Sequence, residues 1–481
     1  MTPMTFAEVE SAVGPGQMHR DPATLDAYAL DVWCPAMMHV DRGTLYSRPE
    51  CVVQPADAAQ IAAILQIANS HGVPVTPHGG GAGDSGCAIP AYGGIVMDLK
   101  GLDRVLDIDE ASLSVTCQTG LYQSDLEETL NDRGYTTNHL PASGYCSTVG
   151  GFLSTRGSGV LSSKYGKIED LVLSMEVVFP NGAIGRTPSV PEHSAGPDFN
   201  RLFLGAEGTL GVITEVTLQI YPLPVDRRFR GYLFSQLGSA LEAGRRIMTQ
   251  GLDPCVIRTY DEDDARVMAK NVLGIEREEI GGWMIIGFDG QFPDIVDLQE
   301  RHAMQICEEL GGEDLGRGPG ERWWNHRYDF YYPPHTLESK HYLYGVTDTI
   351  ASYRDIEPVY RAMREALHGK FAAYDIHFGG HFSHWYEWGT SFYPNFIVRE
   401  PPEDAYEAMR LYNDIFETSI RASMAHGGLL NEHHGVGLKL GRLMKSQFGE
   451  FHTAFQQIKS ALDPNSILNP GKMGLSAGRF E

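Results

Sequence analysis

The feature that most constrains how this chain folds is the glycine-rich run "PHGGGAGDSG" at residues 77–86. It follows directly on "VPVTP", a short run that predicts a β-strand. Because glycine allows backbone conformations closed to other residues, several neighbouring N–H groups can point one way and form an anion-binding nest. The run is neither G-x-x-x-x-G-K-[ST] nor a Rossmann G-x-G-x-x-G that opens a helix. Taken alone, it fits a structural turn as well as a phosphate-binding loop.

Three further segments repeat this small-residue character. They are "PASGYCSTVGG" (141–151), "STRGSG" (154–159) and "GAEGTLGVI" (205–213). One glycine loop beside a strand is common, whereas four are not. Together they predict an extended cofactor whose pyrophosphate is held by backbone N–H groups and hydroxyls.

The charge and composition exclude several classes of partner. The formal charge of −24 disfavours binding to nucleic acid and to anionic membranes. The start, "MTPMTFAEVESAVG", lacks the basic and apolar regions of a signal peptide, and no apolar run approaches the ~18 residues of a transmembrane helix. The seven cysteines include no C-x-x-C pair and are expected to be reduced thiols. We therefore expect a cytoplasmic protein without membrane insertion.

The order of strand-like and helical runs along the chain predicts an α+β fold in three parts. Residues 1–225 read as a mixed α+β unit rich in glycine loops. In residues 226–425, strand-like runs alternate with helical ones, which predicts an antiparallel sheet with helices on one face. The strand-like runs are 229–235, 255–260, 282–288, 341–349, 371–378 and 389–398, and the helical runs are 238–250, 295–311, 356–370 and 403–426. Residues 426–481 form a separate C-terminal segment.

The glycine-rich motifs, taken in order, resemble a known flavoprotein superfamily. "PHGGG", "STVGG" (147–151), "TRGS" (155–158), "YGKIEDLV" and "EGTLGVIT" are similar to the PCMH-type FAD-binding domain of the vanillyl-alcohol oxidase / p-cresol methylhydroxylase superfamily. Within it, the chain most resembles the alkyldihydroxyacetonephosphate synthase branch with its bacterial FAD-binding oxidases, then the D-lactate and glycolate dehydrogenases. The resemblance is strong over residues 45–225, moderate over 370–440, and good again in the tail "ILNPGK".

The resemblance implies a set of FAD-binding residues. The pyrophosphate would be held by Pro77, His78, Gly79, Gly80, Gly81, Ala82 and Gly83. Pro141, Ser143, Ser147, Thr148, Gly150, Gly151, Thr155 and Ser158 would line the flavin and ribityl side, and Glu207, Gly208, Gly211, Val212 and Ile213 the adenosine half. Because the family's covalent flavin linkages use histidines at other positions, we expect non-covalent FAD, with His78 as a polar loop residue.

The stretch "GGLLNEHHGVGLKLG" (427–441) places Glu432, His433 and His434 side by side before Gly435-Val436-Gly437. A polar loop with a chance histidine pair is one interpretation. In the resembling family this segment returns to the flavin, and His434 aligns with its last histidine. The two glycines would then let the backbone approach something large and flat. A neutral imidazole with an ordinary pKa of ~6.5 could take a hydroxyl proton as hydride leaves for flavin N5. We therefore predict His434, with His433 beside it, as catalytic.

Three further side chains take their predicted roles from the resemblance. Tyr393 occupies the position of the synthase's active-site tyrosine. Arg327 and Arg258 stand where the family places arginines for a substrate anion, and a planar guanidinium suits a carboxylate or phosphate. Ordinary surface salt bridges are the alternative for both arginines.

A metal site is the remaining prediction. His377 and His384 are seven residues apart, across an expected bend at Gly379-Gly380, and resemble a histidine pair that binds a divalent metal in the hydroxy-acid dehydrogenases. With His433 they would form a site for zinc or a similar ion. The favoured alternative is that these histidines line a polar pocket.

The sequence thus predicts an FAD-dependent oxidoreductase that oxidises an alcohol or 2-hydroxy acid, aromatic or bulky substrates included, by hydride transfer to the flavin. Two alternatives stay open. One is a synthase-like, redox-neutral exchange through a flavin adduct, although Glu432 replaces the first of the synthase's three histidines. The other is a non-catalytic flavin-binding protein. The expected partners are a small-molecule substrate and an electron acceptor, either oxygen or another; a homodimer stays open.

Overall fold

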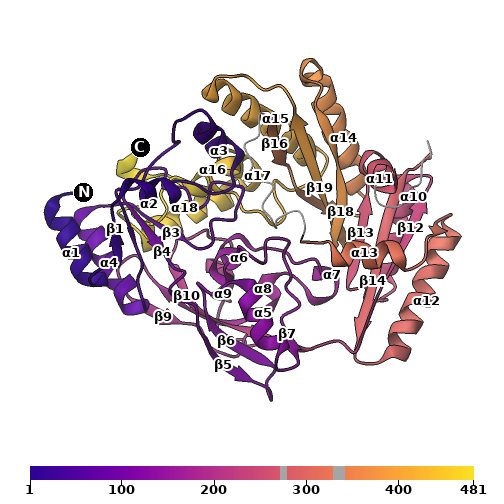
Figure 1. The fold of residues 1–481 in the computed structure, drawn as a ribbon, viewed down its shortest axis with the longest axis horizontal. Coiled ribbons are helices and arrows are strands. Elements are labelled where there is room, and N and C mark those ends of the chain that lie inside the picture. The colour runs from indigo at the N-terminus through magenta and orange to yellow at the C-terminus, as the bar shows by residue number, and fades with distance from the viewer. Residues whose placement is uncertain (271–278, 329–341) are drawn as a thin grey trace.

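The computed structural model describes residues 1–270, 279–328 and 342–481. The N-terminal part begins with a four-stranded sheet in the order β1-β2-β4-β3, in which β2 and β3 both run parallel to β4 (Figure 1). Its strands are β1 (Met18–His19), β2 (Cys51–Val53), β3 (Val75–His78) and β4 (Ile95–Asp98), and its helices are α1 (Pro3–Val13), α2 (Pro22–Ala27), α3 (Cys34–Asp41) and α4 (Ala58–His71). Helix α4 is capped by Asp57 and ends at left-handed Gly72. Strand β3 therefore delivers the chain directly into the glycine run.

A second, five-stranded sheet completes the N-terminal part. Its order is β5-β6-β10-β8-β9, and every pairing is antiparallel. The strands are β5 (Val105–Asp109), β6 (Ser114–Gln118), β8 (Val172–Val178), β9 (Ile184–Arg186) and β10 (Val212–Gln219); β7 (Tyr135–Thr136) pairs separately with β11 (Tyr221–Pro222). The helices are α5 (Gln123–Asn131), α6 (Val149–Thr155), α7 (Ser162–Tyr165), α8 (Ile168–Leu171) and α9 (Asn200–Phe203).

The cap is built on an eight-stranded antiparallel sheet in the order β15-β12-β14-β13-β18-β19-β16, with β17 also paired to β19. Its strands are β12 (Asp226–Phe234), β13 (Val256–Tyr260), β14 (Gly282–Gly290), β15 (Glu313–Asp314), β16 (Leu343–Val346), β17 (Thr349–Ser352), β18 (His377–Trp385) and β19 (Gly389–Val398). The long helices α10 (Leu237–Thr249), α12 (Pro293–Glu309), α14 (Ile356–Lys370) and α15 (Ala405–Ala425) share one core with the sheet. The short helices α11 (Glu262–Met268) and α13 (Gly318–Asn325) pack with sheet residues in two smaller hydrophobic clusters. The predicted α+β class is confirmed.

Two details of the cap differ from the sequence prediction. The predicted strand 371–378 is wrong, because residues 372–374 form a 3-10 turn that ends at left-handed Asp375 before β18 begins. The predicted bend at Gly379-Gly380 is also wrong. Both glycines lie within β18, where a Cβ on Gly380 would stand 2.2 Å from the Tyr393 carbonyl oxygen, so they serve close strand contact. The predicted run 341–349 divides into β16 and β17, and its first residue lies outside the described ranges.

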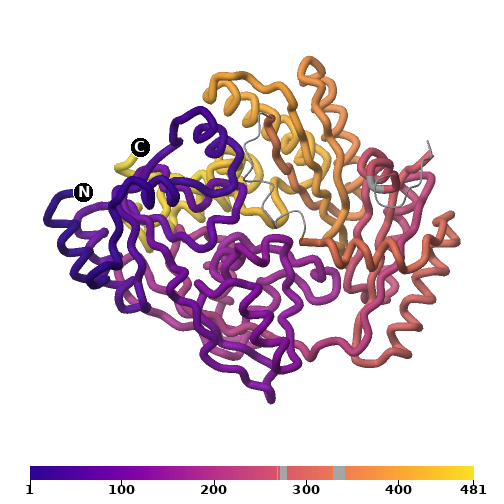
Figure 2. Tube along the Cα trace, in the orientation of Figure 1, coloured from indigo at the N-terminus to yellow at the C-terminus, as the bar shows by residue number. Residues whose placement is uncertain are grey.

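The C-terminal segment returns to the first sheet. It contains α16 (Gly437–Leu440), α17 (Met444–Phe448) and α18 (Glu450–Leu462), followed by an extended tail. The tail runs along β3, since the Val75 N–H donates to Ile467 O at 2.7 Å and the Asn469 N–H to Val75 O at 2.8 Å. The yellow C-terminal trace accordingly lies against the indigo N-terminal part (Figure 2). No helix in the described part of the chain combines the length and apolar content needed to span a membrane.

Candidate active site

A cavity of about 720 Å³ lies where the N-terminal part, the cap and the C-terminal segment meet. Every predicted FAD-binding residue lines it: Pro77, His78, Gly79, Gly80, Gly81, Ala82, Gly83, Pro141, Ser143, Ser147, Thr148, Gly150, Gly151, Thr155, Ser158, Glu207, Gly208, Gly211, Val212 and Ile213. The predicted catalytic residues Arg258, Arg327, Tyr393, His433 and His434 line it as well. The fold thus brings residues from all three parts of the chain to one space.

The glycines of the first loop are needed for contact between loops. A Cβ on Gly80 would stand 1.8 Å from the Cys146 carbonyl oxygen, and one on Gly79 would stand 2.3 Å from Thr148 Oγ1. Thr148 caps helix α6 by accepting a hydrogen bond from the Gly151 N–H at 3.3 Å. Two of the predicted cofactor loops are therefore packed directly on each other, with small residues facing the cavity.

Unsatisfied polar atoms along the cavity wall test whether the cavity suits FAD. Asp31 Oδ2, His78 Nε2, Ser147 Oγ and Asn469 Oδ1 are buried and have no hydrogen-bond partner among the described residues, and all four residues line the cavity. Buried polar groups are normally hydrogen-bonded, so these atoms point to a polar ligand. Burial lowers the pKa of His78 to about 4, so its ring is neutral. A wall of backbone, hydroxyls and neutral polar groups fits a nucleotide-bearing cofactor such as FAD.

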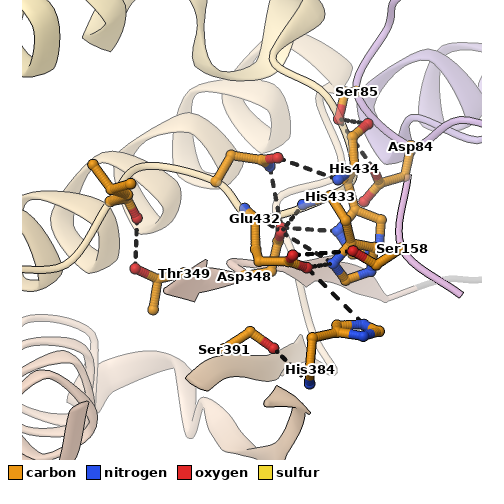
Figure 3. A network of polar contacts seen from close by, with 12 residues as sticks. Asp84, Ser85, Ser158, Asp348, Thr349, His384, Ser391, Glu432, His433 and His434 are labelled. Carbon is orange, nitrogen blue, oxygen red and sulfur yellow. Dashed lines mark hydrogen bonds and ion pairs between the residues drawn. The ribbon is translucent and has the colours of Figure 1, made fainter. Parts of the chain in front are cut away.

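At the other end of the cavity, Asp348 organises the histidine loop (Figure 3). This buried carboxylate lies in the short break between β16 and β17. It accepts hydrogen bonds from the backbone N–H groups of Glu432 (2.8 Å) and His433 (3.1 Å) and pairs with His434 Nδ1 at 2.8 Å. Burial alone would raise the pKa of Asp348, but His434 and His433 outweigh it, so the pKa is lowered and the carboxylate is charged.

Glu432 does for His433 what Asp348 does for His434. Its Oε1 accepts from Lys167 Nζ (2.9 Å), Ser158 Oγ (3.0 Å) and the Tyr386 hydroxyl (3.1 Å), and its Oε2 contacts His433 Nδ1. Burial would raise the pKa of Glu432, yet Lys167 and the neighbouring histidines hold it well below its usual range. Each imidazole of the pair therefore has its own buried, charged carboxylate.

The setting of His434 differs from the prediction of an ordinary pKa. Burial alone would lower the pKa of His434, but the carboxylates of Asp348 and Asp84 outweigh this and raise it. With Nδ1 held by Asp348, the proton resides on Nδ1 in the neutral ring and Nε2 is the nitrogen left for a ligand. The geometry therefore favours His434 as a proton acceptor whose orientation is fixed from behind.

Tyr393 lies among the histidines. Its ring stacks on His381, with centroids 4.7 Å apart, and on His433 at 5.7 Å, and it meets His434 edge-on at 5.1 Å. His381 in turn contacts Arg258 Nη2 through Nδ1 at 3.2 Å. These contacts connect the predicted tyrosine, one arginine and both histidines into a continuous wall.

Arg327 contributes a second guanidinium from α13's C-terminal end. It lies 3.8 Å over the Trp324 ring and donates to the Trp324 carbonyl oxygen at 2.7 Å. Burial lowers the pKa of Arg327, and its buried Nε has no hydrogen-bond partner among the described residues. Arg327 and Arg258 are both partly buried and line the cavity. A guanidinium held in this way suits an anionic group of a ligand.

The predicted metal triad is wrong in His377. This residue stands at the start of β18, 3.9 Å from Asp264 Oδ1, and does not line the cavity. Because a strand rises ~3.3 Å per residue, seven residues within one strand separate it from His384 by roughly 23 Å. Ligand atoms of His384, Glu432 and His433 do lie within 4.8 Å of one another, as do those of Asp348, His433 and His434.

The glycines after the histidines explain how the C-terminal segment is held. Gly435 and Gly437 have φ values of 84° and 47°, and a Cβ on Gly437 would stand 2.1 Å from the Ser85 carbonyl oxygen. The Glu207 carboxylate accepts from the N–H groups of Val436 and Gly437, the latter at 2.8 Å. The close approach expected of these glycines is therefore to the first glycine loop and Glu207.

Sequence reasoning missed the residues that support the histidines. Asp348 and Tyr386 belong to no recognisable motif, and Lys167 lies in "YGKIEDLV", where nothing in the sequence indicates that it reaches Glu432. They come into the site through contacts across long stretches of chain, as between Asp348 and His434.

Comparisons with known proteins agree with this geometry. The chain matches the FAD binding domain family over residues 49–187 and the FAD linked oxidases, C-terminal domain, over residues 223–473. It is 30% identical over 494 residues to an alkyldihydroxyacetonephosphate synthase of Trypanosoma brucei brucei, covering 95% of this chain and 79% of the relative. It is 28% identical over 452 residues to a glycolate oxidase subunit of Bacillus subtilis, covering 89% of each chain.

Solved structures show the same architecture. An alkyldihydroxyacetonephosphate synthase superposes with a TM-score of 0.82 at 25% identity, over 98% of this chain and 86% of the other. A substrate-bound p-cresol methylhydroxylase superposes with a TM-score of 0.76 over 99% and 98% of the two chains, and at 16% identity it supports the fold alone. The predicted PCMH-type fold is confirmed.

Proposed function

The chain belongs to the FAD-linked oxidase family and is an FAD-dependent oxidoreductase, and from that premise we propose that it oxidises an alcohol or 2-hydroxy acid. The observation that carries the proposal is the Asp348–His434 pair, 2.8 Å apart, on the wall of the cavity that the predicted FAD-binding residues also line. Bound FAD, held without a covalent link, would supply the hydride acceptor at N5.

His434 is the proposed base. Its Nε2 accepts the proton of the substrate hydroxyl while Asp348 holds the Nδ1–H and stabilises the imidazolium that results. The raised pKa of His434 makes the ring a stronger proton acceptor once it is neutral. Asp348 stays in place behind His434, because two backbone N–H groups donate to its other carboxylate oxygen.

Arg258 and Arg327 are the proposed anion-binding groups. Both line the cavity, and the Nε of Arg327, which has no hydrogen-bond partner among the described residues, is an available donor. A carboxylate or phosphate on the substrate would bind there, and Tyr393, stacked between His381 and His433, would orient the reacting carbon. This division of roles favours substrates that carry a hydroxyl and an anion on one small molecule.

The test is anaerobic reduction of the FAD-loaded protein by a panel of 2-hydroxy acids and uncharged alcohols. We expect bleaching of the flavin band by one or more members, and a preference for anionic members that weakens in Arg327→Met. Arg317→Met, which breaks an ion pair to Glu300 outside the cavity, is the matched control. Failure of the whole panel would contradict the proposal and leave FAD binding unaffected.

A second candidate is the synthase-like, redox-neutral exchange that the resemblance implies. It is favoured by the 30% identity to the trypanosomal synthase and by the clustering of Tyr393, His433 and His434. The replacement of a third histidine by Glu432 weighs against it. The two candidates separate in one measurement, because a transfer forms product anaerobically without net bleaching of the flavin. A protein that only stores flavin would do neither.

A further inference from the structure

The tail "ILNPGK" (467–472) has no part in the proposed reaction, yet it is buried against the cavity. Asn469 is 2% exposed and Lys472 is 0% exposed. Asn469 itself lines the cavity, close to where β3 enters the first glycine loop. Neither side chain is explained by packing of an apolar core, so their polar groups need another account.

The hydrogen bonds of Asn469 settle which way its amide points. Its Nδ2 donates to Cys87 O at 3.0 Å and to Glu207 O at 2.7 Å. Both amide hydrogens are thereby used, and Oδ1 points the opposite way. This oxygen is buried and has no partner among the described residues. A reversed amide would set its oxygen against two carbonyl oxygens, so the orientation is unambiguous.

The backbone holds Asn469 in a conformation that most residues avoid. Its φ is 41°, in the left-handed region, and its N–H donates to Val75 O at 2.8 Å. Asparagine tolerates this region better than most residues, but a glycine would adopt it at lower cost. The chain therefore retains a side chain amide at a position where the backbone alone would favour glycine.

Lys472 fixes the same loop from the other side. Its Nζ donates to Gly86 O at 2.5 Å and to Ile89 O at 2.6 Å, on either side of the Cys87 carbonyl that Asn469 binds. Lys472 does not line the cavity. It therefore acts on the cavity wall from behind, through the loop that it holds.

Asn469 lies toward the histidine end of the cavity. Its partners Cys87 and Glu207 also border Gly435, the residue after His434, since a Cβ on Gly435 would stand 3.3 Å from Cys87 Sγ and 3.0 Å from Glu207 Oε1. The half of FAD that reacts must lie at this end if His434 is the base, and on that point the inference rests on the proposed function.

We propose that Asn469 binds the flavin half of FAD, with Oδ1 accepting a hydrogen bond from a ring N–H or a ribityl hydroxyl, and that Lys472 positions the loop that orients this amide. The tail thus completes the cofactor site from the far end of the chain. A carbonyl oxygen fixed by two donated hydrogen bonds is a directed acceptor, because the amide cannot rotate without breaking both.

The test is FAD and FMN titration of the apoprotein, followed by flavin fluorescence, in wild type, Asn469→Gly and Lys472→Met. Asn469→Gly keeps the positive φ and removes only the amide. We expect it to weaken binding of both FAD and FMN by ~10-fold, the scale of one buried hydrogen bond, and to shift the absorption band of the flavin that remains bound. Lys472→Met should lower the melting temperature of the apoprotein, and it should weaken binding of both flavins by less than Asn469→Gly does.

Three outcomes would overturn the proposal. In one, Asn469→Gly binds both flavins as tightly as wild type. In another, it weakens FAD but leaves FMN unchanged, which would place the contact on the adenosine half. In the third, both variants lose affinity only in proportion to their loss of apoprotein stability, which would make Asn469 a bridge between loops. Since no substrate is used, failure of the proposed reaction would leave these results intact.

Discussion

The two ends of the cavity are built on different principles. The end lined by Gly79, Gly80 and Thr148 consists of backbone and small residues, and its glycines are required by contacts between loops. The histidine end consists of large polar side chains, and each of its two adjacent imidazoles is backed by a buried carboxylate. The first end suits a ligand of matching shape and polarity, whereas the second carries the imidazole–carboxylate pairs on which the proposed proton transfer depends. Binding and chemistry should therefore be separable by mutation.

The substitution expected to have the largest effect on the rate of flavin reduction is His434→Ala. Flavin reduction by a good substrate should slow by ~10²–10⁴-fold, the usual scale for a lost acid–base group. The FAD content should stay near that of wild type, because the predicted cofactor residues lie mainly in other loops. Anaerobic stopped-flow at equal flavin concentration measures the rate, and the absorption spectrum after gel filtration measures the FAD content.

A wild-type rate in His434→Ala at every pH would show that the imidazole is not the base. His433 or Tyr393 would then take the role, since both line the same wall. Loss of FAD together with the rate would contradict the separation of the two ends.

Asp348→Asn should have the next largest effect. The amide cannot serve as the anion that backs His434. Its oxygen would accept from the backbone N–H groups of Glu432 and His433, so its NH₂ group would face His434 Nδ1 and favour the ring proton on Nε2. We expect flavin reduction to slow by ~10–100-fold, as for other residues that orient a functional histidine. The matched variant is Glu432→Gln, which acts on His433. If His434 is the base, Glu432→Gln should slow reduction less; the reverse order would transfer the role to His433.

The contrast between the two ends also decides what the sequence could predict. The glycine loops are local, so their residues were identified from short motifs, and all of them line the cavity. His433 and His434 were visible for the same reason. Glu432 belongs to the same motif, but the other supporting groups do not: Asp348 lies in a strand break far from the histidines, and Lys167 reaches Glu432 from a distant part of the chain.

The errors have the same origin. The pairing of His377 with His384 follows from their spacing and its likeness to a family's metal-binding pair, but a continuous strand carries the two apart, and only the pairing of β18 with β19 shows that it is continuous. The contacts of Gly435 and Gly437 with Glu207 and Ser85 were also beyond reach, because those residues lie far away in the sequence. Spacing predicts local geometry, and it does not report which distant segment lies opposite.

Buried histidines should make the stability of the fold fall in acid, and we expect this effect to be smaller than those of the His434 and Asp348 variants. Burial lowers the pKa of His78 to about 4 and that of His384 and His139 to about 3. In the unfolded chain their pKa is ~6.5. Above pH 6.5 neither state binds these protons, so stability is highest there. Between pH 6.5 and 4 these histidines bind protons in the unfolded chain but not in the folded chain, so the free energy of unfolding falls.

His139→Phe tests this point without touching the cavity. His139 is buried against Phe152, with ring centroids 4.7 Å apart, and neither ring nitrogen has a hydrogen-bond partner among the described residues. The variant should melt at about the wild-type temperature at pH 7.5 and above it at pH 5. His302→Gln, an exposed histidine on α12, is the control and should follow wild type. Parallel melting curves for all three proteins would contradict the prediction.

The smallest expected effect is that of a chelator, and the reason lies in Lys167. Its Nζ is 2.9 Å from Glu432 Oε1 and 2.6 Å from the Glu432 carbonyl oxygen, so a positive charge already occupies the carboxylate that a cation at His384, Glu432 and His433 would need. A divalent ion would have to displace the His433 contact at Oε2 and remain beside the ammonium, where like charges repel. We therefore expect protein dialysed against chelator to keep its FAD and its rate of flavin reduction.

Lys167→Met sharpens the test, because it removes the ammonium and leaves three ligands: this variant should bind zinc in a titration followed by metal analysis, and wild type should not. Stoichiometric metal in wild type, with loss of reduction on its removal, would contradict this account and move the histidine end from a proton-transfer site to a Lewis-acid site.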